Sequence, residues 1–341
     1  MLNHFGKRFR KAEKFMLAIQ VDTTQTGRPL VWQATADPTF GPDEVLVDVQ
    51  TTALNRADLA QRAGHYPPPP GASDIIGLEM AGQIAEIGAN VRNWKVGDRV
   101  CALLPGGGYA ERVTVPQEML MPIPSGWSYE QAGALPEVYL TAFVNLYMEA
   151  NVQPGETVLV HGGASGVGTA AIQLLKASGN RVLVTAGSAD KCAACANLGA
   201  DLAINYREED FAEKVGAFTN SAGVDVILDM VGADYLARNL SLLKLKGRMV
   251  FIALLSGSQA PIDLGLLQRK RLRLIGSLLR SRALAEKIEI KEKFMTRFWP
   301  LLEAGKIQPV IDSVYPIAQA NEAQQRMAEN LNIGKIVLQV R

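Results

Sequence analysis

The sequence predicts an α/β protein in which a doubly wound parallel sheet, with helices on both faces, is inserted into a barrel-like β-domain. The chain has 341 residues, which is too long for one typical core and suits two domains. Short β-runs broken by Gly and Pro fill its first part, whereas continuous apolar strands alternate with helical stretches from about Asn151. The tail from Val310 to Val340 is β-like again, so we expect it to return to the first domain.

The first domain is predicted from runs whose partial alternation and close turn signals are typical of antiparallel strands. These runs span residues 44–54, 80–88, 98–104 and 110–116. With the tail, they predict a domain of residues 16–139 and 305–341 that starts at the strand-like Met16. Residues 1–15 form a basic leader, poor in acids, that we expect to lie outside the fold. An organellar presequence is the alternative, although the leader lacks the usual serines.

The second domain, residues 140–304, is predicted from six unbroken Val/Ile/Leu runs. Strands of this kind are buried on both faces, and six of them match a complete doubly wound dinucleotide-binding sheet. The predicted strands are 157–161, 181–185, 201–205, 224–229, 247–253 and 272–277. The predicted helices are 166–178, 190–198, 208–218, 235–243 and a longer one at about 283–304.

A glycine-rich turn follows the first of these strands, in the segment ETVLVHGGASGVGTAAIQLL. Glycines at this point permit a tight turn and a close approach of the backbone to a pyrophosphate. The N-terminus of the next helix adds unpaired N–H groups and the positive end of its dipole. The turn, at Gly162, Gly163, Ser165, Gly166 and Gly168, is therefore predicted to bind a dinucleotide. A glycine turn that binds nothing is the alternative.

The residues at the end of the second strand indicate which dinucleotide is bound. Binders of a ribose 2′-hydroxyl carry Asp or Glu there, about 20 residues past the glycines. Here the strand RVLVT ends in Ala186, Gly187 and Ser188, with Lys191 one turn into the next helix. Tyr206 and Arg207 follow the third strand. A neutral pocket beside an ammonium group favours the 2′-phosphate of NADPH. Asp190 argues against this assignment, unless its carboxylate only stabilises the N-terminus of the helix through the helix dipole.

Composition excludes several classes of partner. The formal net charge of +1 gives no bulk attraction to nucleic acid or membrane. No segment has the run of about 18 apolar residues that a membrane-spanning helix needs. The basic run 269–273 is a local exception, which we interpret as a solvated helix end. Three cysteines are too few for a disulfide framework and fit a reducing compartment, so we expect a cytoplasmic protein.

Longer segments of the chain resemble one family. They include ALNRADLAQRAGHYPPPPGAS, GLEMAGQIAEIG, LPEVYLTAF, HGGASGVGTAAIQL, TAGSADK, GSLLRSR and NIGKIVL. They are similar to the zinc-free quinone oxidoreductases of the medium-chain dehydrogenase/reductase superfamily, the zeta-crystallin-like branch, and most of all to its tumour-suppressor-inducible type. The resemblance implies a Rossmann domain inserted in a GroES-like barrel, NADPH as the cofactor, and homodimers or homotetramers.

The resemblance also implies which residues contact the cofactor. The turn motif would lie at the pyrophosphate, the residues after the second and third strands would hold the 2′-phosphate, and those after the fifth and sixth strands would border the nicotinamide. The tail motif would close over the cofactor. The implied cofactor-binding residues are Asn55, Thr141, Ser165, Gly166, Val167, Gly187, Ser188, Lys191, Tyr206, Phe251, Ala253, Gly276, Ser277, Leu278, Asn332 and Lys335.

The positions that bind zinc in metal-dependent relatives carry unsuitable residues here. Asn55 stands where those relatives have a cysteine, and Leu78 stands in place of a histidine. Neither side chain is a ligand that zinc prefers. Cys101 is alone where a structural zinc lobe would need four cysteines, and the pair Cys192 and Cys195 is interpreted as helix packing. The sequence therefore predicts no metal.

Without zinc, nothing strongly polarises an alcohol, whereas a quinone is already electrophilic. We therefore expect NADPH-dependent reduction of quinones or related conjugated carbonyl compounds, with Tyr66 and Asn55 as candidate catalytic residues. Tyr66 would stack on the acceptor or hydrogen-bond its carbonyl, unless it only anchors its loop. Asn55 would orient a carbonyl or the cofactor amide, unless it only caps a turn. Reduction of the C=C bond of enones or enals, and a binding protein that senses NADPH, are the alternatives.

Overall fold

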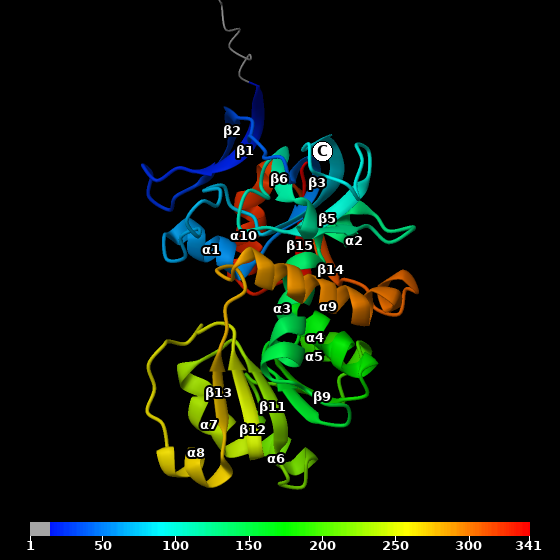
Figure 1. Cartoon of the computed structure of the whole chain (residues 1–341). Coiled ribbons are helices and arrows are strands. Elements are labelled where there is room, and N and C mark those ends of the chain that lie inside the picture. Colours follow the sequence, from blue (N-terminus) through cyan, green and yellow to red (C-terminus); the bar gives the residue numbers. More distant parts are fainter. Residues whose placement is uncertain (1–13) are drawn as a thin grey trace, which may run out of the picture.

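Two sheets organise the protein, whose computed structural model describes residues 14–341. Figure 1 shows them one above the other, with helix α9 crossing between them. The upper sheet has the order β14-β15-β3-β4-β5-β7, with β6 paired to β3. Its strands are β3 (Glu44–Ala53), β4 (Glu79–Ile87), β5 (Arg99–Leu103), β6 (Arg112–Pro116), β7 (Leu120–Pro122), β14 (Ile311–Pro316) and β15 (Lys335–Gln339). A separate antiparallel pair, β1 (Phe15–Val21) and β2 (Leu30–Ala36), precedes it.

The tail joins the upper sheet, because β15 pairs antiparallel with β3 and parallel with β14. It is not β-like throughout, as the sequence analysis expected, since α10 (Ala320–Ala328) interrupts it. Ala320, Ala323 and Met327 are buried at helical spacing, a pattern too short and too polar to stand out in the sequence. β1 begins at Phe15, one residue before the predicted start, Lys14 before it pairs with Glu86, and residues 1–13 of the basic leader lie outside the described residues.

The lower sheet is parallel, with the order β10-β9-β8-β11-β12-β13. All six predicted strands are present, as are the predicted helices. The strands are β8 (Thr157–Val160), β9 (Arg181–Ala186), β10 (Leu202–Asn205), β11 (Val224–Asp229), β12 (Leu243–Phe251) and β13 (Arg273–Gly276). The predicted helices are α4 (Gly166–Ala177), α5 (Ala189–Asn197), α6 (Phe211–Phe218), α7 (Leu236–Leu242) and α9 (Leu284–Glu303), and α8 (Leu264–Lys270) is an additional helix that was not predicted. The predicted fold class is confirmed, and the strand order reverses beside β8, where doubly wound sheets bind ligands.

Three short helices of the upper half were missed. They are α1 (Arg56–Ala63), α2 (Tyr129–Gly133) and α3 (Pro136–Phe143). The segment NRAD opens α1 and is not a turn closed by a pair between Arg56 and Asp58. Asp58 is buried and accepts from the Asn55 N–H and the Tyr109 hydroxyl, at 2.7 and 3.0 Å, while Arg56 reaches Asn330.

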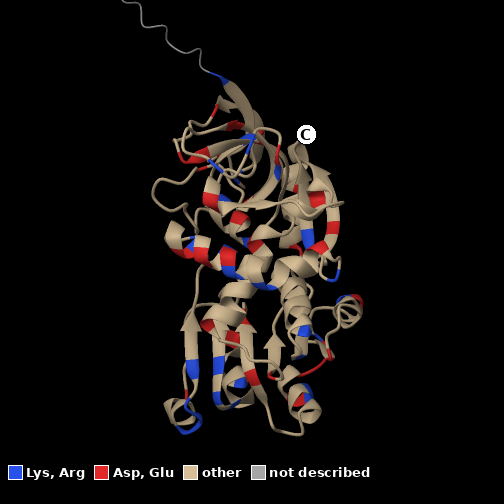
Figure 2. Cartoon of the chain, turned by 45° about the vertical axis from the view of Figure 1, so that its right-hand side comes forward, with Lys and Arg blue, Asp and Glu red and all other residues tan. Residues whose placement is uncertain are grey.

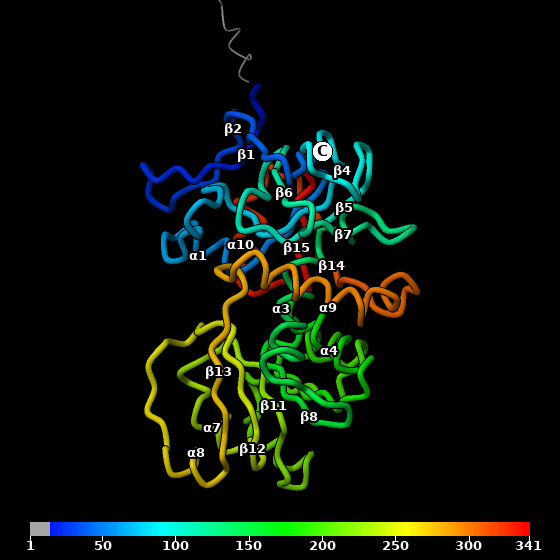
Figure 3. The backbone as a smooth tube through the Cα atoms, in the orientation of Figure 1, coloured from blue at the N-terminus to red at the C-terminus, as the bar shows by residue number. Residues whose placement is uncertain are grey.

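Two helical segments carry the chain between the halves. The chain descends through α3 and the π-helix η2 (Val144–Glu149), and it returns through α9 (Figure 3). The buried stripe of α9 (Ile290, Phe294, Phe298 and Leu302) has the spacing of one helix face. Phe294 packs edge-on to Phe143, with 5.7 Å between ring centroids. The hydrophobic core is therefore continuous from one sheet to the other.

Both signs of charge are interspersed over the two halves (Figure 2), in line with the net charge of +1. Within the described part of the chain, no helix combines the length and the apolar character needed to cross a bilayer. The basic run 269–273 begins at the end of α8, where Arg271 takes a left-handed conformation that stops the helix.

Candidate functional site

The glycine turn lies between β8 and α4, at the edge of the parallel sheet where the strand order reverses. Gly162 has a φ of +64°, and a Cβ on Gly168 would lie 2.3 Å from the Gly162 carbonyl oxygen, so both positions require glycine. The Ser165 hydroxyl caps α4 by accepting from the Gly168 N–H at 3.0 Å. The turn therefore brings the backbone and the N-terminus of α4 close together without a side chain in between, the arrangement that a pyrophosphate needs.

The tail motif packs directly on this turn. The Gly334 N–H donates to the Ala164 carbonyl at 2.8 Å, and Ser165 and Gly334 form an isolated β-bridge. A Cβ on Gly166 would meet the Lys335 side chain at 2.7 Å. Asn332 and Lys335 thus lie beside the turn that the sequence analysis assigned to the pyrophosphate.

The residues predicted to hold the 2′-phosphate also come together. Ser188 caps α5 by accepting from the Lys191 N–H at 3.3 Å. The Tyr206 hydroxyl lies 2.8 Å from where a Cβ on Gly187 would be, and this tyrosine is 41% exposed. The Lys191 ammonium donates to the Asn330 carbonyl oxygen. Small residues and one lysine therefore lie together at the carboxyl ends of β9 and β10.

Arg56 and Arg207 join Lys191 in a cationic cluster. The pKa of Lys191 is lowered by burial first and then by Arg207 and Arg56, while Asp312, itself paired with Arg326, acts weakly in the opposite sense. Within residues 14–341, no ion pair is formed by any of these three side chains. Arg56 donates to the side-chain oxygen of Asn330, whose backbone carbonyl accepts from Lys191. Three cations without a carboxylate partner make a site suited to a dianionic phosphate.

A buried network holds the other end of the site. Glu79 is 0% exposed, and one of its oxygens accepts from Lys335 at 2.7 Å and from the Asn55 amide at 2.9 Å. The Lys335 ammonium also donates to the Leu54 carbonyl at 2.6 Å and to the Asn55 side-chain oxygen at 2.8 Å. All three of its N–H bonds are thus used, and its methylene stem packs on Gly166.

Tyr66 lies where the two halves meet, against Arg280. The Arg280 guanidinium carbon is 5.2 Å from the Tyr66 ring centroid, a distance that suits a cation–π contact. Arg280 is only 4% exposed and donates to the Tyr66 and Pro105 carbonyls and to Gln61, at 3.4, 2.8 and 2.8 Å. Among the described residues, no hydrogen bond is formed by the Tyr66 hydroxyl. The ring is therefore anchored while its hydroxyl stays free for a ligand.

The residues predicted to border the nicotinamide lie at the carboxyl ends of the parallel strands, as the glycine turn does. Phe251 and Gly276 are register partners at the ends of β12 and β13, and the Ser277 N–H donates to the Phe251 carbonyl at 3.0 Å. Leu278 is exposed, and Ala253 follows β12. Thr141 lies on α3, where its carbonyl accepts from the Asn145 side chain at 2.8 Å. These residues and the glycine turn surround the carboxyl ends of the central strands.

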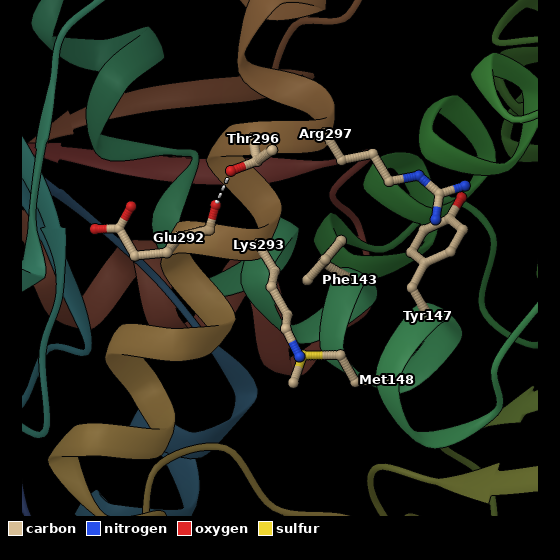
Figure 4. A pocket seen from close by; sticks show the side chains of 7 residues that line it. All are labelled: Phe143, Tyr147, Met148, Glu292, Lys293, Thr296 and Arg297. Atoms are coloured by element: carbon tan, nitrogen blue, oxygen red, sulfur yellow. Dashed lines mark hydrogen bonds between the residues drawn. The ribbon is translucent and has the colours of Figure 1, made fainter.

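A surface hollow between η2 and α9 is a separate feature (Figure 4). Figure 4 shows Arg297 over the ring of Tyr147, and the guanidinium carbon lies 4.0 Å from the ring centroid. Glu292, Lys293 and Thr296 of α9 also line this hollow. None of the predicted site residues lines this hollow, so we do not assign the site to it.

Comparison with known proteins gives the same picture of the fold. The family model for the alcohol dehydrogenase GroES-like domain matches residues 41–125, and that for zinc-binding dehydrogenases matches residues 166–295. The quinone oxidoreductase-like protein 2 of Bos taurus is 32% identical over 318 residues, covering 92% of this chain and 90% of its own. The chain belongs to the quinone oxidoreductase branch of the medium-chain dehydrogenase/reductase superfamily.

Other relatives of this medium-chain oxidoreductase extend the comparison. The synaptic vesicle membrane protein VAT-1 homolog of Homo sapiens is 33% identical over 320 residues, covering 89% of this chain and 80% of its own. A Pseudomonas syringae quinone oxidoreductase superposes with a TM-score of 0.85 at 30% identity, covering 95% and 100% of the two chains. An Escherichia coli quinone oxidoreductase complexed with NADPH gives 0.83 at 28%, covering 96% and 100%. The CurK enoyl reductase gives 0.84 at 27%, covering 96% and 99%.

The matched domain model is named for zinc, but the donor set of this oxidoreductase does not fit a zinc ion. Asn55 is committed to Glu79 and Lys335, and Leu78 is a buried hydrocarbon. Cys101 is buried, which raises the pKa of its thiol, and Cys195 is buried in α5. Within residues 14–341, no three His, Cys, Asp or Glu side chains are grouped so that they could hold a metal.

We expect activity to survive prolonged treatment with a strong chelator. The reason is that an amide and a leucine replace the thiolate and imidazole that would bind zinc. Elemental analysis of active protein measures bound zinc, and turnover after dialysis against the chelator measures dependence on it. A zinc-dependent alcohol dehydrogenase treated in parallel serves as the control. Stoichiometric zinc combined with chelator-sensitive turnover would contradict the prediction.

Besides Glu79, which holds Asn55 and Lys335, the structure adds three residues that the sequence analysis did not use in the site. Arg56 belongs to the cationic cluster, Arg280 carries the Tyr66 ring, and Glu137 of α3 lies against Glu79 through its backbone N–H, at 2.9 Å. Each lies in a segment that carries the family resemblance, NRAD, GSLLRSR or LPEVYLTAF. Those motifs could have indicated that these segments belong to the site, but they do not show which side chains contact one another.

Proposed function

We propose that this oxidoreductase uses NADPH to reduce quinones or related conjugated carbonyl compounds without a metal. The observation that carries the cofactor assignment is the cationic cluster of Arg56, Lys191 and Arg207 beside Gly187, where no strand-end acid competes. A 2′-phosphate is a dianion, and charge-assisted hydrogen bonds to cations are the strong ones. The similarity to a quinone oxidoreductase complexed with NADPH supports the same assignment.

The glycine turn, the cationic cluster and the ends of β12 and β13 are the residues that would hold the cofactor, and together they fit a dinucleotide. When bound, the nicotinamide supplies a hydride. The protein contributes binding, orientation and exclusion of water. Because Asn55 and Leu78 offer no zinc ligands, the site favours an acceptor that is already electrophilic, such as a quinone.

Reduction of an activated C=C bond in enones or enals is the second candidate, supported by the similarity to the CurK enoyl reductase. Both reactions need hydride delivery into an open cleft. Turnover of one quinone and one enone, each with NADPH and NADH, separates them. NADPH binding without turnover of either acceptor would instead support a cofactor-sensing binding protein.

Tyr66 is the residue that we propose to act on the acceptor. Tyr66→Phe is expected to lower kcat for a quinone, because the ring stays on Arg280 while the free hydroxyl is lost. Tyr66→Ala should in addition weaken acceptor binding, by about 0.5–1.5 kcal/mol if a flat ring stacks there. Steady-state kinetics measure both effects.

Tyr129→Phe is the matched control for Tyr66, since Tyr129 also packs on an arginine, Arg99, but outside the site. The prediction fails if Tyr66→Ala leaves quinone kinetics unchanged. It also fails if the variant only weakens NADPH binding in the absence of acceptor, because the loop would then serve the cofactor.

We also propose a homodimer or homotetramer. β13 is an edge strand of the parallel sheet, and exposed leucines follow β12 and β13, including Leu254, Leu255 and Leu278. A second copy that covers this edge would remove both the open strand and the apolar surface from water. The three free cysteines support a reducing compartment such as the cytoplasm.

A further inference from the structure

The side-chain amide of Asn55 is almost fully used by the buried network around Glu79. Its Nδ2 donates to Oε1 of Glu79 at 2.9 Å and to the Ala53 carbonyl oxygen at 3.3 Å, and its Oδ1 accepts from the Lys335 ammonium at 2.8 Å. Because an ammonium group only donates and a carboxylate only accepts, these contacts fix which end of the amide is oxygen. The one hydrogen-bonding position left on this side chain is the second lone pair of Oδ1.

Glu79 and Lys335 are themselves held in place. Oε2 of Glu79 accepts from the Glu137 backbone N–H at 2.9 Å, and Lys335, only 2% exposed, also donates to the Leu54 carbonyl at 2.6 Å. If the Asn55 amide turned over, its N–H groups would face the ammonium and its oxygen would face the carboxylate. Each buried polar group left unpaired in this way costs about 1–3 kcal/mol. The ion pair therefore holds the amide in one orientation.

An amide fixed in this orientation can accept a hydrogen bond from a ligand but cannot donate one. A quinone or enone carbonyl is itself an acceptor, whereas the nicotinamide half of the cofactor carries donors, the carboxamide N–H and the ribose O–H groups. Asn55 is 9% exposed, so it is not sealed off from a ligand. The stem of Lys335 leads from Asn55 to the glycine turn, where a Cβ on Gly166 would lie 2.7 Å from Cδ of the lysine.

We infer that Glu79 and Lys335 are positioning residues, and that the Asn55 oxygen they orient accepts a hydrogen bond from a donor on the nicotinamide half of the cofactor. The inference rests on the proposed function. It separates the two candidate catalytic residues, because Asn55 then serves the cofactor while Tyr66 is left to contact the acceptor.

Direct titration of three nucleotides, in the absence of acceptor, tests this assignment. They are NADP⁺, its 3-acetylpyridine analogue, in which a methyl ketone replaces the carboxamide, and adenosine 2′,5′-bisphosphate, which lacks the nicotinamide half. Asn55→Leu keeps the size of the side chain and removes its oxygen. It should weaken the binding of NADP⁺ about three- to tenfold, the usual effect of one lost hydrogen bond, and should not change the binding of the bisphosphate.

The analogue identifies the donor. If the carboxamide donates, Asn55→Leu should leave the binding of the analogue unchanged, because the analogue lacks that N–H. If a ribose hydroxyl donates, NADP⁺ and the analogue should be weakened by the same factor. Equal weakening of all three nucleotides, or of none, would overturn the inference. Asn55→Ser, which is too short to reach the network but suits the N-terminus of α1, repeats the test if the leucine variant does not fold.

Glu79→Gln tests the positioning role. A glutamine has one acceptor oxygen for the three donors that the Glu79 carboxylate now satisfies, so the Asn55 amide is no longer held in one orientation. The variant should bind NADP⁺ as weakly as Asn55→Leu does and the bisphosphate as the wild type does. Combining the two changes should weaken NADP⁺ no further, because both remove the same contact. A purely structural role of Glu79 would instead add to the loss.

Steady-state kinetics at saturating NADPH separate the cofactor from the acceptor. The KM for a quinone should keep its wild-type value in Asn55→Leu and Glu79→Gln. A raised KM for the quinone, combined with unchanged affinity for NADP⁺, would overturn the inference, because the amide would then act on the acceptor.

Asn180→Leu is the matched control. Asn180 is also buried, and its amide donates to the Gln153 and Glu156 carbonyls at 2.7 and 3.2 Å, before the amino end of β9 and away from the glycine turn. It should bind all three nucleotides as the wild type does. Wild-type turnover with unchanged nucleotide binding in Asn55→Leu and Glu79→Gln would refute this inference alone. A wild type that neither binds NADPH nor reduces quinones or enones would refute the proposed function, and the inference with it.

Discussion

Replacing Lys191 by alanine is expected to raise the apparent KM for NADPH about ten- to a hundredfold, and that for NADH far less. Loss of one charge-assisted contact with a phosphate costs roughly 1.5–3 kcal/mol, which corresponds to this range. Lys191 has no carboxylate partner among the described residues, and its ammonium is held only by the Asn330 carbonyl. Removing it should therefore disturb the cationic cluster without leaving a buried acid behind.

Steady-state kinetics with each cofactor, and direct titration of each in the absence of acceptor, measure this effect. Lys176→Ala is the matched control, since Lys176 pairs with Asp201 at the amino ends of β9 and β10, with 2.9 Å between the charged atoms. It should change neither cofactor constant. Equal losses for NADPH and NADH in Lys191→Ala would show that Lys191 does not hold a 2′-phosphate.

Replacing Lys335 by methionine is expected to lower the free energy of unfolding by about 3–5 kcal/mol. The substitution leaves Glu79 buried without its cation, and an uncompensated buried charge has this cost. Glu79 is 0% exposed, and the Lys335 ammonium lies 2.7 Å from its Oε1. Denaturant unfolding, followed by fluorescence or circular dichroism, measures the change.

A double variant separates this charge effect from packing. Glu79→Leu combined with Lys335→Met removes both charges and should be less destabilised than Lys335→Met alone. Lys214→Met is the control, because the ion pair of Lys214 with Glu209 is largely exposed and should contribute under about 1 kcal/mol. A loss in Lys335→Met no larger than in Lys214→Met would show that Glu79 is stabilised by other means.

The sequence was most informative about the parallel sheet. Its strands are buried on both faces and therefore form continuous apolar runs, bounded by glycines and helix caps such as Ser165 and Asp210. The helices of the upper half were harder to predict from the sequence. α1 and α10 are short and polar, and their buried faces show only once the tail is placed against β3. Helices of this length depend on tertiary contacts more than on local preference.

The site divides in the same way. The glycine turn and the small residues beside Gly187 are local features, because the residues that form each of them are neighbours in the sequence. Arg56, Arg280 and Glu137 were not foreseen, because their roles depend on residues far along the chain. Arg56 meets Asn330, which is 274 residues away, and Arg280 meets Gln61 across 219 residues. Composition and spacing cannot state such pairings.

Asn330 accepts from a cation of each half, Arg56 from the upper and Lys191 from the lower. A phosphate that binds these two cations competes with Asn330 for both of its donors at once. The free energy of recognising that phosphate is therefore coupled to the free energy that holds the two halves together. NADPH and NADH differ by this one group, so they are expected to leave the halves with different freedom to move.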